Sequence, residues 1–270
     1  MKTPTLLLLG CGKMGGALAQ GWMDSQHPPQ LLILDRKLQK APGNALIYRK
    51  IQEIPSDIKP DLIILAVKPA MAEEMITALK THLGDKMAQS ALLSVMAAKS
   101  CAQLAHMSGN EATPVIRTMP NTPASVGAGA IGMYFSPHVT EDQKLLAKKL
   151  MGQVGEVVIV PHEDDLRSVI AVSGSSPAYV FLLAELLERT GIELGLEQTV
   201  ARKLARTMIY GAGKMLHDLD DDATTLRENV TSPNGTTAAA LHVLMDEKNW
   251  PRTIRLASQE AVRRAKELDH

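Results

Sequence analysis

Three glycines near the N-terminus have the spacing of a phosphate-binding turn. Gly10, Gly12 and Gly15 form the pattern G-x-G-x-x-G directly after the apolar run Leu6–Leu9. In a strand–turn–helix unit the first glycine allows a tight turn, and the second lets the backbone approach a pyrophosphate. The third lets the next helix pack closely on the strand, with its N–H groups and dipole facing the phosphates. The pattern predicts a dinucleotide site, with a purely structural turn as the alternative.

A second apolar run supports the dinucleotide interpretation. Leu31–Leu34 ends at Asp35, about twenty residues after the turn, where such folds carry the residue that accepts from a ribose 2′-OH. An acid there also repels a 2′-phosphate, whereas the next residues, Arg36 and Lys37, supply two cations suited to that phosphate. We therefore expect NADP as cofactor, with NADPH preferred over NADH.

Polar and proline-rich clusters follow three further apolar runs. They are Ala66–Pro69, Met119–Pro123 and Ser173–Tyr179. The carboxyl ends of the strands in an open α/β sheet face the ligand, so the first two clusters are expected to line the cofactor groove. The third opens a helical region and is expected to close over it. Each cluster taken alone is equally compatible with a rigid loop.

A fourth cluster, Val230–Thr237, immediately precedes a helical pattern and brings together several hydroxyl groups. Hydroxyls and free N–H groups at a helix start make a carboxylate site that needs no basic side chain. The alternative is an ordinary helix N-cap.

The order of the apolar runs predicts an α/β chain in two parts. Short Leu/Ile/Val runs alternate with helical stretches up to about Val160, which is typical of βαβ units and a mostly parallel sheet. After Pro161 the apolar residues follow helical spacing alone. We expect a dinucleotide-binding domain over residues 1–161 and an all-helical substrate-binding and dimerisation domain over residues 162–270. The expected strands, besides the first, are Leu31–Asp35, Leu62–Val67, Ala91–Val95, Val115–Met119, Ile131–Tyr134 and Val157–Val160.

The helical part carries apolar faces that a single chain has difficulty covering. Val200, Leu204, Met208 and Met215 share one face of the helix expected over Glu197–His217. Long apolar helices of this kind often bury part of themselves against a second subunit. The pattern predicts a homodimer.

Composition excludes several classes of function. With 29 basic and 29 acidic residues the net charge is zero, so nucleic acid and anionic membranes are not expected partners. The run Leu6–Leu9 is too short for a signal sequence or a membrane span. Two cysteines, Cys11 and Cys101, fit a reducing compartment, and we expect a cytoplasmic protein. The eight histidines form no close pair, so no metal site is expected.

Taken together, these segments resemble pyrroline-5-carboxylate reductase over the whole chain. The most specific piece is Ser232–Thr237, which is similar to the family's S-P-G-G-T-T signature. The resemblance implies a Rossmann-like N-terminal domain and a helical C-terminal domain that interlocks with a partner's. It also implies assembly of dimers into a larger ring such as a decamer.

The resemblance also implies roles for individual residues. The turn Gly10, Gly12, Lys13, Met14 and Gly15 would hold the pyrophosphate, and Ala66, Val67, Lys68, Pro69 and Asn121 would lie on the nicotinamide side. Ser232, Gly235 and Thr236 would bind the substrate carboxylate, and Thr237 would hydrogen-bond the ring nitrogen and serve as the catalytic residue.

Two departures from the family pattern stand near the signature. Asn234 replaces its first glycine, and asparagine tolerates left-handed backbone geometry better than most residues. Asp222-Ala223 occupies the place of a His-Pro pair that follows an acid. Asp220 is then either that substrate-binding acid or a plain exposed acid at a helix end.

The function that the resemblance implies is reduction of 1-pyrroline-5-carboxylate to L-proline by hydride transfer from NAD(P)H, the last step of proline synthesis. Two alternatives stay open. One is a reductase of another imine or of a hydroxyacid, and the other is a protein that senses nicotinamide dinucleotides without chemistry. The intact Ser232–Thr237 cluster argues against the sensor, and the lack of an evident catalytic lysine on a helix of the second domain argues against hydroxyacid chemistry.

Overall fold

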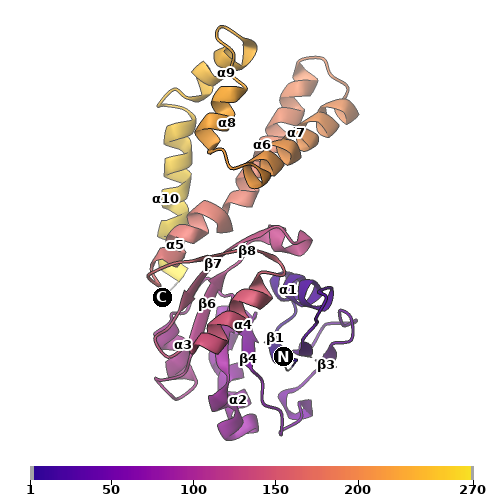
Figure 1. The fold of residues 1–270 in the computed structure, drawn as a ribbon, viewed down its shortest axis with the longest axis vertical. Coiled ribbons are helices and arrows are strands. Elements are labelled where there is room, and N and C mark those ends of the chain that lie inside the picture. Colours follow the sequence, from indigo (N-terminus) through magenta and orange to yellow (C-terminus); the bar gives the residue numbers. More distant parts are fainter. Residues whose placement is uncertain (1–2, 269–270) are drawn as a thin grey trace. The chain divides into compact units, whose positions relative to one another are not determined.

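The computed structural model describes residues 3–268 and divides the chain into two compact units (Figure 1). One unit comprises Met1–Gly174 with Val262–His270, and the other comprises Ser175–Ala261.

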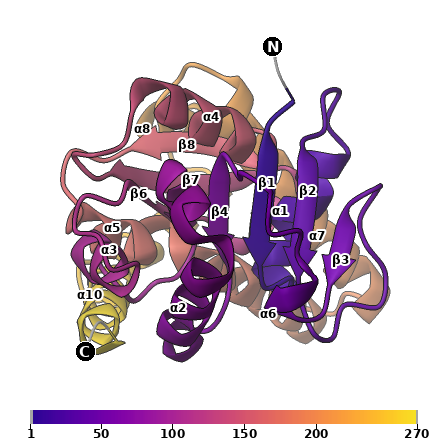
Figure 2. The same ribbon diagram turned by 90° about the horizontal axis from the view of Figure 1, so that it is seen from below.

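The first unit is built on a sheet of eight strands in the order β3-β2-β1-β4-β5-β6-β7-β8 (Figure 2). β6 and β7 pair antiparallel and all other neighbours pair parallel. This confirms the predicted mostly parallel sheet. The strands are β1 (Thr5–Leu9), β2 (Gln30–Leu34), β3 (Leu46–Tyr48), β4 (Leu62–Leu65), β5 (Ala91–Ser94), β6 (Val115–Met119), β7 (Gly129–Phe135) and β8 (Gly155–Ile159).

Helices cover both faces of this sheet, because alternate residues of each central strand point to opposite sides. Leu6 and Leu8 of β1 share one core with α1 (Lys13–Met23) and α4 (Glu141–Met151). Leu7 and Leu9 share the other core with α2 (Ala72–Leu83) and α3 (Cys101–Met107). Burial on both faces explains why these strands read as continuous apolar runs.

A short helical segment ends the first unit. Helix α5 (Asp165–Val169) continues into a π-helix over Ile170–Gly174. Its Leu166 and Ala171 are buried. π-Helical turns are rare and often occur at functional sites.

The second unit is helical, as predicted. It contains α6 (Ser176–Glu193), α7 (Gln198–Asp218), α8 (Ala223–Asn229) and α9 (Thr236–Leu244), whereas α10 (Trp250–Leu268) continues across the division at Ala261. Arg202 of α7 forms a bidentate ion pair with Glu188 of α6, with Nη2 of Arg202 2.8 Å from Oε1 of Glu188.

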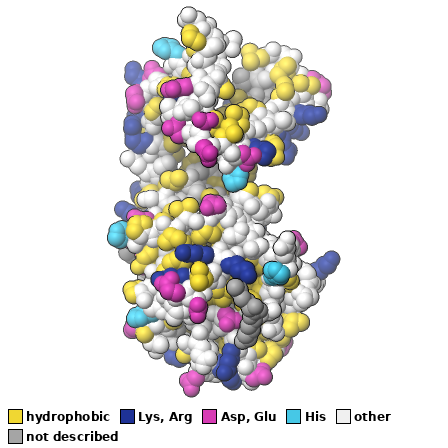
Figure 3. Space-filling view, viewed as in Figure 1, with side chains coloured by type: hydrophobic (Ala, Val, Ile, Leu, Met, Phe, Trp, Pro, Cys, Tyr) yellow, Lys and Arg dark blue, Asp and Glu magenta, His cyan; other side chains and the backbone are white. Residues whose placement is uncertain are grey.

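The helical unit exposes many apolar side chains, some of which Figure 3 shows on its surface. Val200, Leu204, Met208 and Met215 of α7 are between 43% and 57% exposed. The predicted apolar face of this helix is therefore uncovered within one chain. An apolar surface of this kind marks an interface.

One helical stretch, Asp165–Glu193, is long and apolar enough to cross a membrane, judged by length and composition alone. A single stretch of this kind is weak evidence, because helices that pack inside soluble proteins meet the same criterion.

Candidate active site

The glycine turn after β1 fits a pyrophosphate. Gly10 has a φ of 88°, and a Cβ there would lie 2.7 Å from the carbonyl oxygen of Ala66, so the loop after β4 packs directly on the turn. A Cβ on Gly15 would collide with the carbonyl oxygen of Gly10. A Cβ on Gly12 would meet no atom within 4 Å, which leaves open space beside the backbone where a phosphate group approaches.

Helix α1 presents an uncompensated positive end at this turn. Its N-cap is Gly12, which makes no side-chain capping bond, and its first turn contains no acidic residue. The free N–H groups and the helix dipole favour an anion there. β1 lies between β2 and β4, where the strand order reverses, which is the place where open α/β sheets bind ligands.

Asp35, at the end of β2, ties this turn to the neighbouring loop. Its Oδ2 accepts the N–H of Cys11 at 2.8 Å, and its Oδ1 accepts the N–H groups of Lys37 and Leu38 at 2.7 and 3.0 Å. Partial burial raises the pKa of Asp35, but these backbone hydrogen bonds and the charge of Arg49 outweigh it and hold the pKa below its usual value. Asp35 is therefore an ionised acceptor within the loop structure.

No pattern in the sequence indicates a role for Arg49. It follows β3, and its Nη1 donates to the carbonyl oxygen of Asp35 at 2.8 Å. Arg36 and Lys37 follow β2 and are exposed. Only the parallel pairing of β2 and β3, in which Leu34 is opposite Tyr48, brings the segments that carry these three cations next to each other.

The loop after β4 reaches the same edge of the sheet. The N–H of Ala66 donates to the carbonyl oxygen of Leu9 at 2.9 Å, which fixes the loop beside β1. Val67 is half-buried and Lys68 is exposed. Lys68 has extended backbone and precedes a short 3-10 turn that begins at Pro69.

Asn121, in the loop after β6, is 6% exposed and uses both ends of its side chain within the first unit. Its Nδ2 donates to the carbonyl oxygen of Ser173 at 3.0 Å, and its Oδ1 accepts the N–H of Ala130 at 2.9 Å. Asn121 therefore holds the loop after β6 against β7 and the π-helix.

The second group of expected site residues lies at the start of α9. Gly235 is its N-cap and makes no side-chain capping bond, so the first N–H groups of α9 are free for an anion. A Cβ on Gly235 would lie 2.5 Å from Oγ of Ser232 and 3.2 Å from its carbonyl oxygen, so a larger residue here would displace the Ser232 hydroxyl. Asn234 has a φ of 58°, the left-handed geometry expected of the residue that replaces a signature glycine.

Four other residues, at the starts of α8 and α9 or on the segment before α8, differ in their surroundings. Thr237 is half-buried and Thr236 is exposed. Asp220 is exposed on the segment between α7 and α8. Asp222 caps α8 by accepting the N–H of Thr225 at 2.7 Å, and this bond lowers its pKa. Asp222 thus has a structural task in the place of the family's His-Pro pair.

The structure places the expected residues in two groups. The cofactor group gathers at the carboxyl edge of the parallel strands in the first unit, and the substrate group lies in the second unit. The first group is Gly10, Gly12, Lys13, Met14, Gly15, Asp35, Arg36, Lys37, Ala66, Val67, Lys68, Pro69 and Asn121, and the second is Asp220, Ser232, Gly235, Thr236 and Thr237.

Neither cysteine is a nucleophile at neutral pH. Burial and the charge of Asp35 raise the pKa of the Cys11 thiol to about 11. Burial, with the charge of Glu163, raises the pKa of the Cys101 thiol to about 12. Among residues 3–268, no group of three or more His, Cys, Asp or Glu side chains is placed to hold a metal ion.

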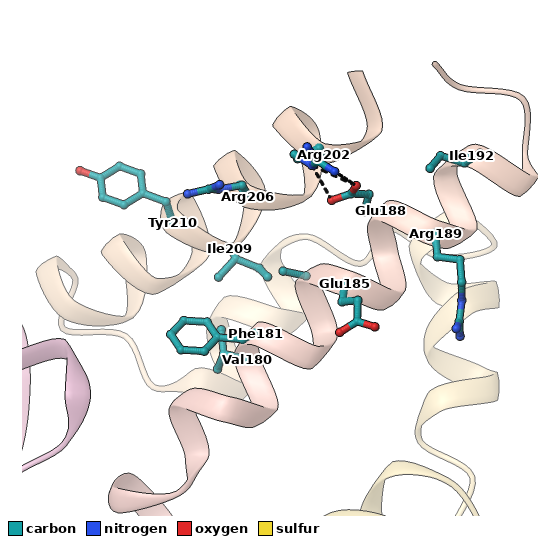
Figure 4. A pocket seen from close by; sticks show the side chains of 11 residues that line it. Val180, Phe181, Glu185, Glu188, Arg189, Ile192, Arg202, Arg206, Ile209 and Tyr210 are labelled. Atoms are coloured by element: carbon teal, nitrogen blue, oxygen red, sulfur yellow. Dashed lines mark hydrogen bonds and ion pairs between the residues drawn. The ribbon is translucent and has the colours of Figure 1, made fainter. Parts of the chain in front are cut away.

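A groove of about 690 Å³ lies between α6 and α7 (Figure 4). Apolar side chains such as Phe181 and Ile209 line it together with Arg206 and the Glu188–Arg202 ion pair. None of the expected site residues lines this groove. It belongs to the exposed apolar surface of the helical unit.

Comparison with known proteins finds matches in both units of the chain. The family model described as NADP oxidoreductase coenzyme F420-dependent matches residues 5–98, and the one described as pyrroline-5-carboxylate reductase dimerisation matches residues 163–268. The pyrroline-5-carboxylate reductase of Haemophilus influenzae is 34% identical over 100% of this chain and 99% of its own length. The chain belongs to the pyrroline-5-carboxylate reductase family. Pyrroline-5-carboxylate reductase 1 of Bacillus subtilis is 37% identical over 77% of this chain and 68% of its own length.

Solved structures of the family have the same fold. A pyrroline-5-carboxylate reductase from Coxiella burnetii superposes with a TM-score of 0.91 at 31% identity, and each chain is covered completely. The Plasmodium falciparum pyrroline carboxylate reductase with NADP bound gives a TM-score of 0.84 at 25% identity, again over both whole chains. These matches confirm the predicted Rossmann-like sheet domain followed by a helical region.

The dimerisation match covers α6 and α7, whose apolar residues are exposed in one chain. Membership in this family supports oligomerisation of the chain, and it supports a nicotinamide dinucleotide as cofactor.

Proposed function

We propose that the protein reduces 1-pyrroline-5-carboxylate to L-proline with NADPH. The observation that carries the proposal is the start of α9, where the N-cap Gly235 and the hydroxyl of Ser232 leave an uncapped helix end for a carboxylate. The substrate is a small cyclic imine with one carboxylate, which is the kind of anion that this helix end accepts. The family's signature segment occupies the same residues.

Different residues of the substrate group bind the carboxylate and the ring nitrogen of the imine. Gly235 and Thr236 form the start of the helix that binds the carboxylate, through the free N–H of Thr236, because the N–H of Gly235 already donates to the carbonyl oxygen of Ser232. Ser232 donates from its hydroxyl, and Thr237 hydrogen-bonds the ring nitrogen. These contacts fix which face of the ring is open to attack. An imine that is protonated before the attack is already electrophilic, so the residues serve to position the reactants and need no strong general acid.

The cofactor residues hold the dinucleotide along the carboxyl edge of the sheet. The turn from Gly10 to Gly15 takes the pyrophosphate, and the loop Ala66–Pro69 with Asn121 lies on the nicotinamide side. When bound, NADPH supplies the hydride that adds to C5 of the imine. We assign residues 1–161 to cofactor binding and residues 162–270 to substrate binding and dimerisation.

A turnover assay tests this function. The purified protein is incubated with 1-pyrroline-5-carboxylate and NADPH, and both cofactor oxidation and proline are measured. Oxidation with an equal amount of proline is the expected result. Oxidation only with other imines or hydroxyacids would identify a different reductase. Tight cofactor binding without turnover on any of these substrates would identify a sensor.

The preference for NADPH over NADH rests on Arg36 and Lys37, which are exposed beside the end of β2. We expect Arg36→Ala to reduce the ratio of kcat/KM for NADPH to that for NADH. An unchanged ratio would refute the assigned role of Arg36.

The assembly that we propose is a homodimer formed through the helical unit, with dimers joined into a larger ring such as a decamer. Light scattering coupled to gel filtration measures the mass directly. We also propose a cytoplasmic location, because both cysteines are free, as is usual in a reducing compartment.

A further inference from the structure

Three cationic residues follow the neighbouring strands β2 and β3. Arg36 and Lys37 follow β2, and Arg49 follows β3. Within residues 3–268, none of the three forms an ion pair with a carboxylate. This cation corner, defined as Arg36, Lys37 and Arg49, therefore carries positive charge that no direct ion pair neutralises, although the charge of Arg49 also acts on Asp35.

The nearby carboxylates are already engaged by backbone N–H groups. Asp35 accepts three of them, from Cys11, Lys37 and Leu38. Oε2 of Glu53 accepts the N–H groups of Arg49 and Lys50 at 2.7 and 3.3 Å. A carboxylate whose oxygens already accept N–H donors has fewer lone pairs to offer a ribose hydroxyl. The positive ends of the N–H dipoles also weaken its repulsion of a phosphate.

Arg49 is held in place on the β2 side. The N–H of Asp35 donates to the carbonyl oxygen of Tyr48 at 3.1 Å, and Nη1 of Arg49 donates back to the carbonyl oxygen of Asp35 at 2.8 Å. Arg49 is half-buried, so its position is fixed better than that of an exposed arginine. A guanidinium held through one nitrogen still has N–H donors on Nε and Nη2.

We infer that Arg49 is a specificity-determining residue that binds the 2′-phosphate of NADPH, together with Arg36 and Lys37, while Asp35 positions the glycine turn and does not select the ribose. The inference rests on the proposed function for the identity of the cofactor. Its chemistry is the bidentate pairing of a planar guanidinium with phosphate oxygens, which a lysine does not reproduce.

Nucleotide binding without substrate tests this role directly. Isothermal titration calorimetry compares 2′,5′-ADP, which carries the phosphate at the 2′ position, with ADP, which lacks it. We expect Arg49→Met to raise the dissociation constant of 2′,5′-ADP by about tenfold or more and that of ADP by less than about twofold. Arg49→Lys keeps the charge but lacks the planar guanidinium that pairs with two phosphate oxygens. Its affinity for 2′,5′-ADP is expected to lie between those of the wild type and Arg49→Met.

Lys59→Met is the matched control. Lys59 is exposed just before the start of β4, at the amino ends of the parallel strands, whereas the cation corner lies at their carboxyl ends, so this variant loses the same charge far from that corner. It should bind both nucleotides like the wild type. Equal weakening of both nucleotides by Arg49→Met would overturn the inference, because it would indicate an adenine or folding role. Unchanged binding of 2′,5′-ADP would overturn it as well.

The two hypotheses fail separately. If Arg49→Met does not fold, as judged by its thermal unfolding, the ratio of the two affinities in Arg49→Lys decides, and a wild-type ratio overturns the inference. Selective loss of 2′,5′-ADP supports the role of Arg49 even in a protein that does not reduce 1-pyrroline-5-carboxylate. If Arg49→Met forms proline and binds both nucleotides with wild-type affinity, the proposed function stands and the role of Arg49 in binding the 2′-phosphate is rejected.

Discussion

The side chain of Asn121 donates a hydrogen bond to the backbone carbonyl oxygen of Ser173 at 3.0 Å. The bond joins two of the polar clusters that the sequence marks as candidate ligand loops. The hydroxyl of Ser173 donates to the carbonyl oxygen of Val169 at 3.1 Å, inside the short helical segment. The loop after β6 is thus anchored to the segment that leads into the helical unit, so Asn121 has a structural role besides its proposed place near the nicotinamide.

This bond predicts a large effect of Asn121→Asp. The aspartate keeps the acceptor for the N–H of Ala130 but places a carboxylate oxygen against the carbonyl oxygen of Ser173. We expect the free energy of unfolding to fall by about 2–4 kcal/mol, measured by urea denaturation. Asn110→Asp is the control, because Oδ1 of Asn110 also accepts a backbone N–H, from Ala112, at an exposed site. Equal stability of both variants would contradict the anchoring role.

The contact between Gly235 and Ser232 makes a second prediction. Loss of the Ser232 hydroxyl in Ser232→Ala should raise the KM for 1-pyrroline-5-carboxylate about fivefold, the equivalent of about 1 kcal/mol. In Gly235→Ala the added Cβ displaces Oγ of Ser232, so the KM should rise at least as much. The KM for NADPH serves as the internal control. Additive effects in the double variant would show that the two residues act independently.

The main elements of the fold could be predicted from the sequence, because the buried parallel strands are continuous apolar runs and the long helices have apolar residues at helical spacing. Strand β3 could not, since it has three residues and only the pairing with β2 stabilises it. Helix α8 has seven residues, none of them buried, so it leaves no periodic apolar signal. Its capping residue, Asp222, is one of several aspartates in that segment, and nothing in the sequence distinguishes it as the helix cap.

The site shows a similar limit. The glycine turn and the start of α9 are local in sequence, and their geometry follows from the residue types. Arg49 belongs to the cofactor edge only because β2 and β3 are neighbours, which no local pattern encodes. The hydrogen bond from Cys11 to Asp35 also joins the loops that follow two different strands, β1 and β2. A rule that assigns an acid after the second strand to the ribose cannot detect that its oxygens already accept N–H groups.

The buried pair of Arg117 and Glu163 supports a third prediction. Nη1 of Arg117 lies 2.8 Å from Oε1 of Glu163, which also accepts the N–H of Cys101, and the Arg117 side chain is 9% exposed. Glu163→Gln leaves a buried guanidinium without its anion and should cost about 3 kcal/mol of the free energy of unfolding, measured in urea. Glu141→Gln, which breaks an exposed pair with Lys144, should leave the urea midpoint nearly unchanged. A similar, small effect of both substitutions would show that Arg117 is solvated.

Asp35 gives the fourth prediction, which concerns pH. Its pKa is lower in the folded protein than the ordinary value of 3.8, so the folded state binds this proton more weakly than the unfolded state. The resulting stabilisation is complete above about pH 5 and is lost as the pH falls below about 4 towards the folded pKa. The difference in Tm between wild type and Asp35→Asn should therefore shrink as the pH falls from 5 to 3. A difference in Tm that stays constant with pH would contradict a stabilising role for the ionised carboxylate of Asp35.

The same variant separates the two roles considered for Asp35. If Asp35 positions the glycine turn through its hydrogen bonds, it supports the site for both cofactors. Asp35→Asn should then weaken the binding of ADP and of 2′,5′-ADP by similar factors in calorimetry. If Asp35 instead binds the ribose 2′-OH, Asp35→Asn should weaken the binding of ADP alone and leave the affinity for 2′,5′-ADP unchanged or higher. The second result would restore the role that the sequence predicts.

The fifth prediction concerns Thr237, the residue that we place against the reacting nitrogen. Thr237 occupies the second position of α9, and its hydroxyl makes no hydrogen bond to any part of the chain that the structure describes; the N-cap is Gly235. The hydroxyl is therefore free for a ligand and does not cap the helix. Thr237→Val keeps the shape and removes the donor. We expect kcat/KM for 1-pyrroline-5-carboxylate to fall by about ten- to a hundredfold, the equivalent of about 1.4–2.8 kcal/mol in the transition state.

A stability measurement on the same preparation excludes a structural explanation. If Thr237 caps the helix, the valine variant should lose about 1 kcal/mol of unfolding free energy and keep its turnover per folded molecule. If Thr237 holds the imine nitrogen, the Tm and the affinity for NADPH should stay at wild-type values while kcat/KM falls. Thr224→Val is the matched control, because Thr224 occupies the second position of α8 and is exposed. A destabilised Thr237→Val with full activity would remove Thr237 from the catalytic assignment, and the start of α9 would then act on the carboxylate alone.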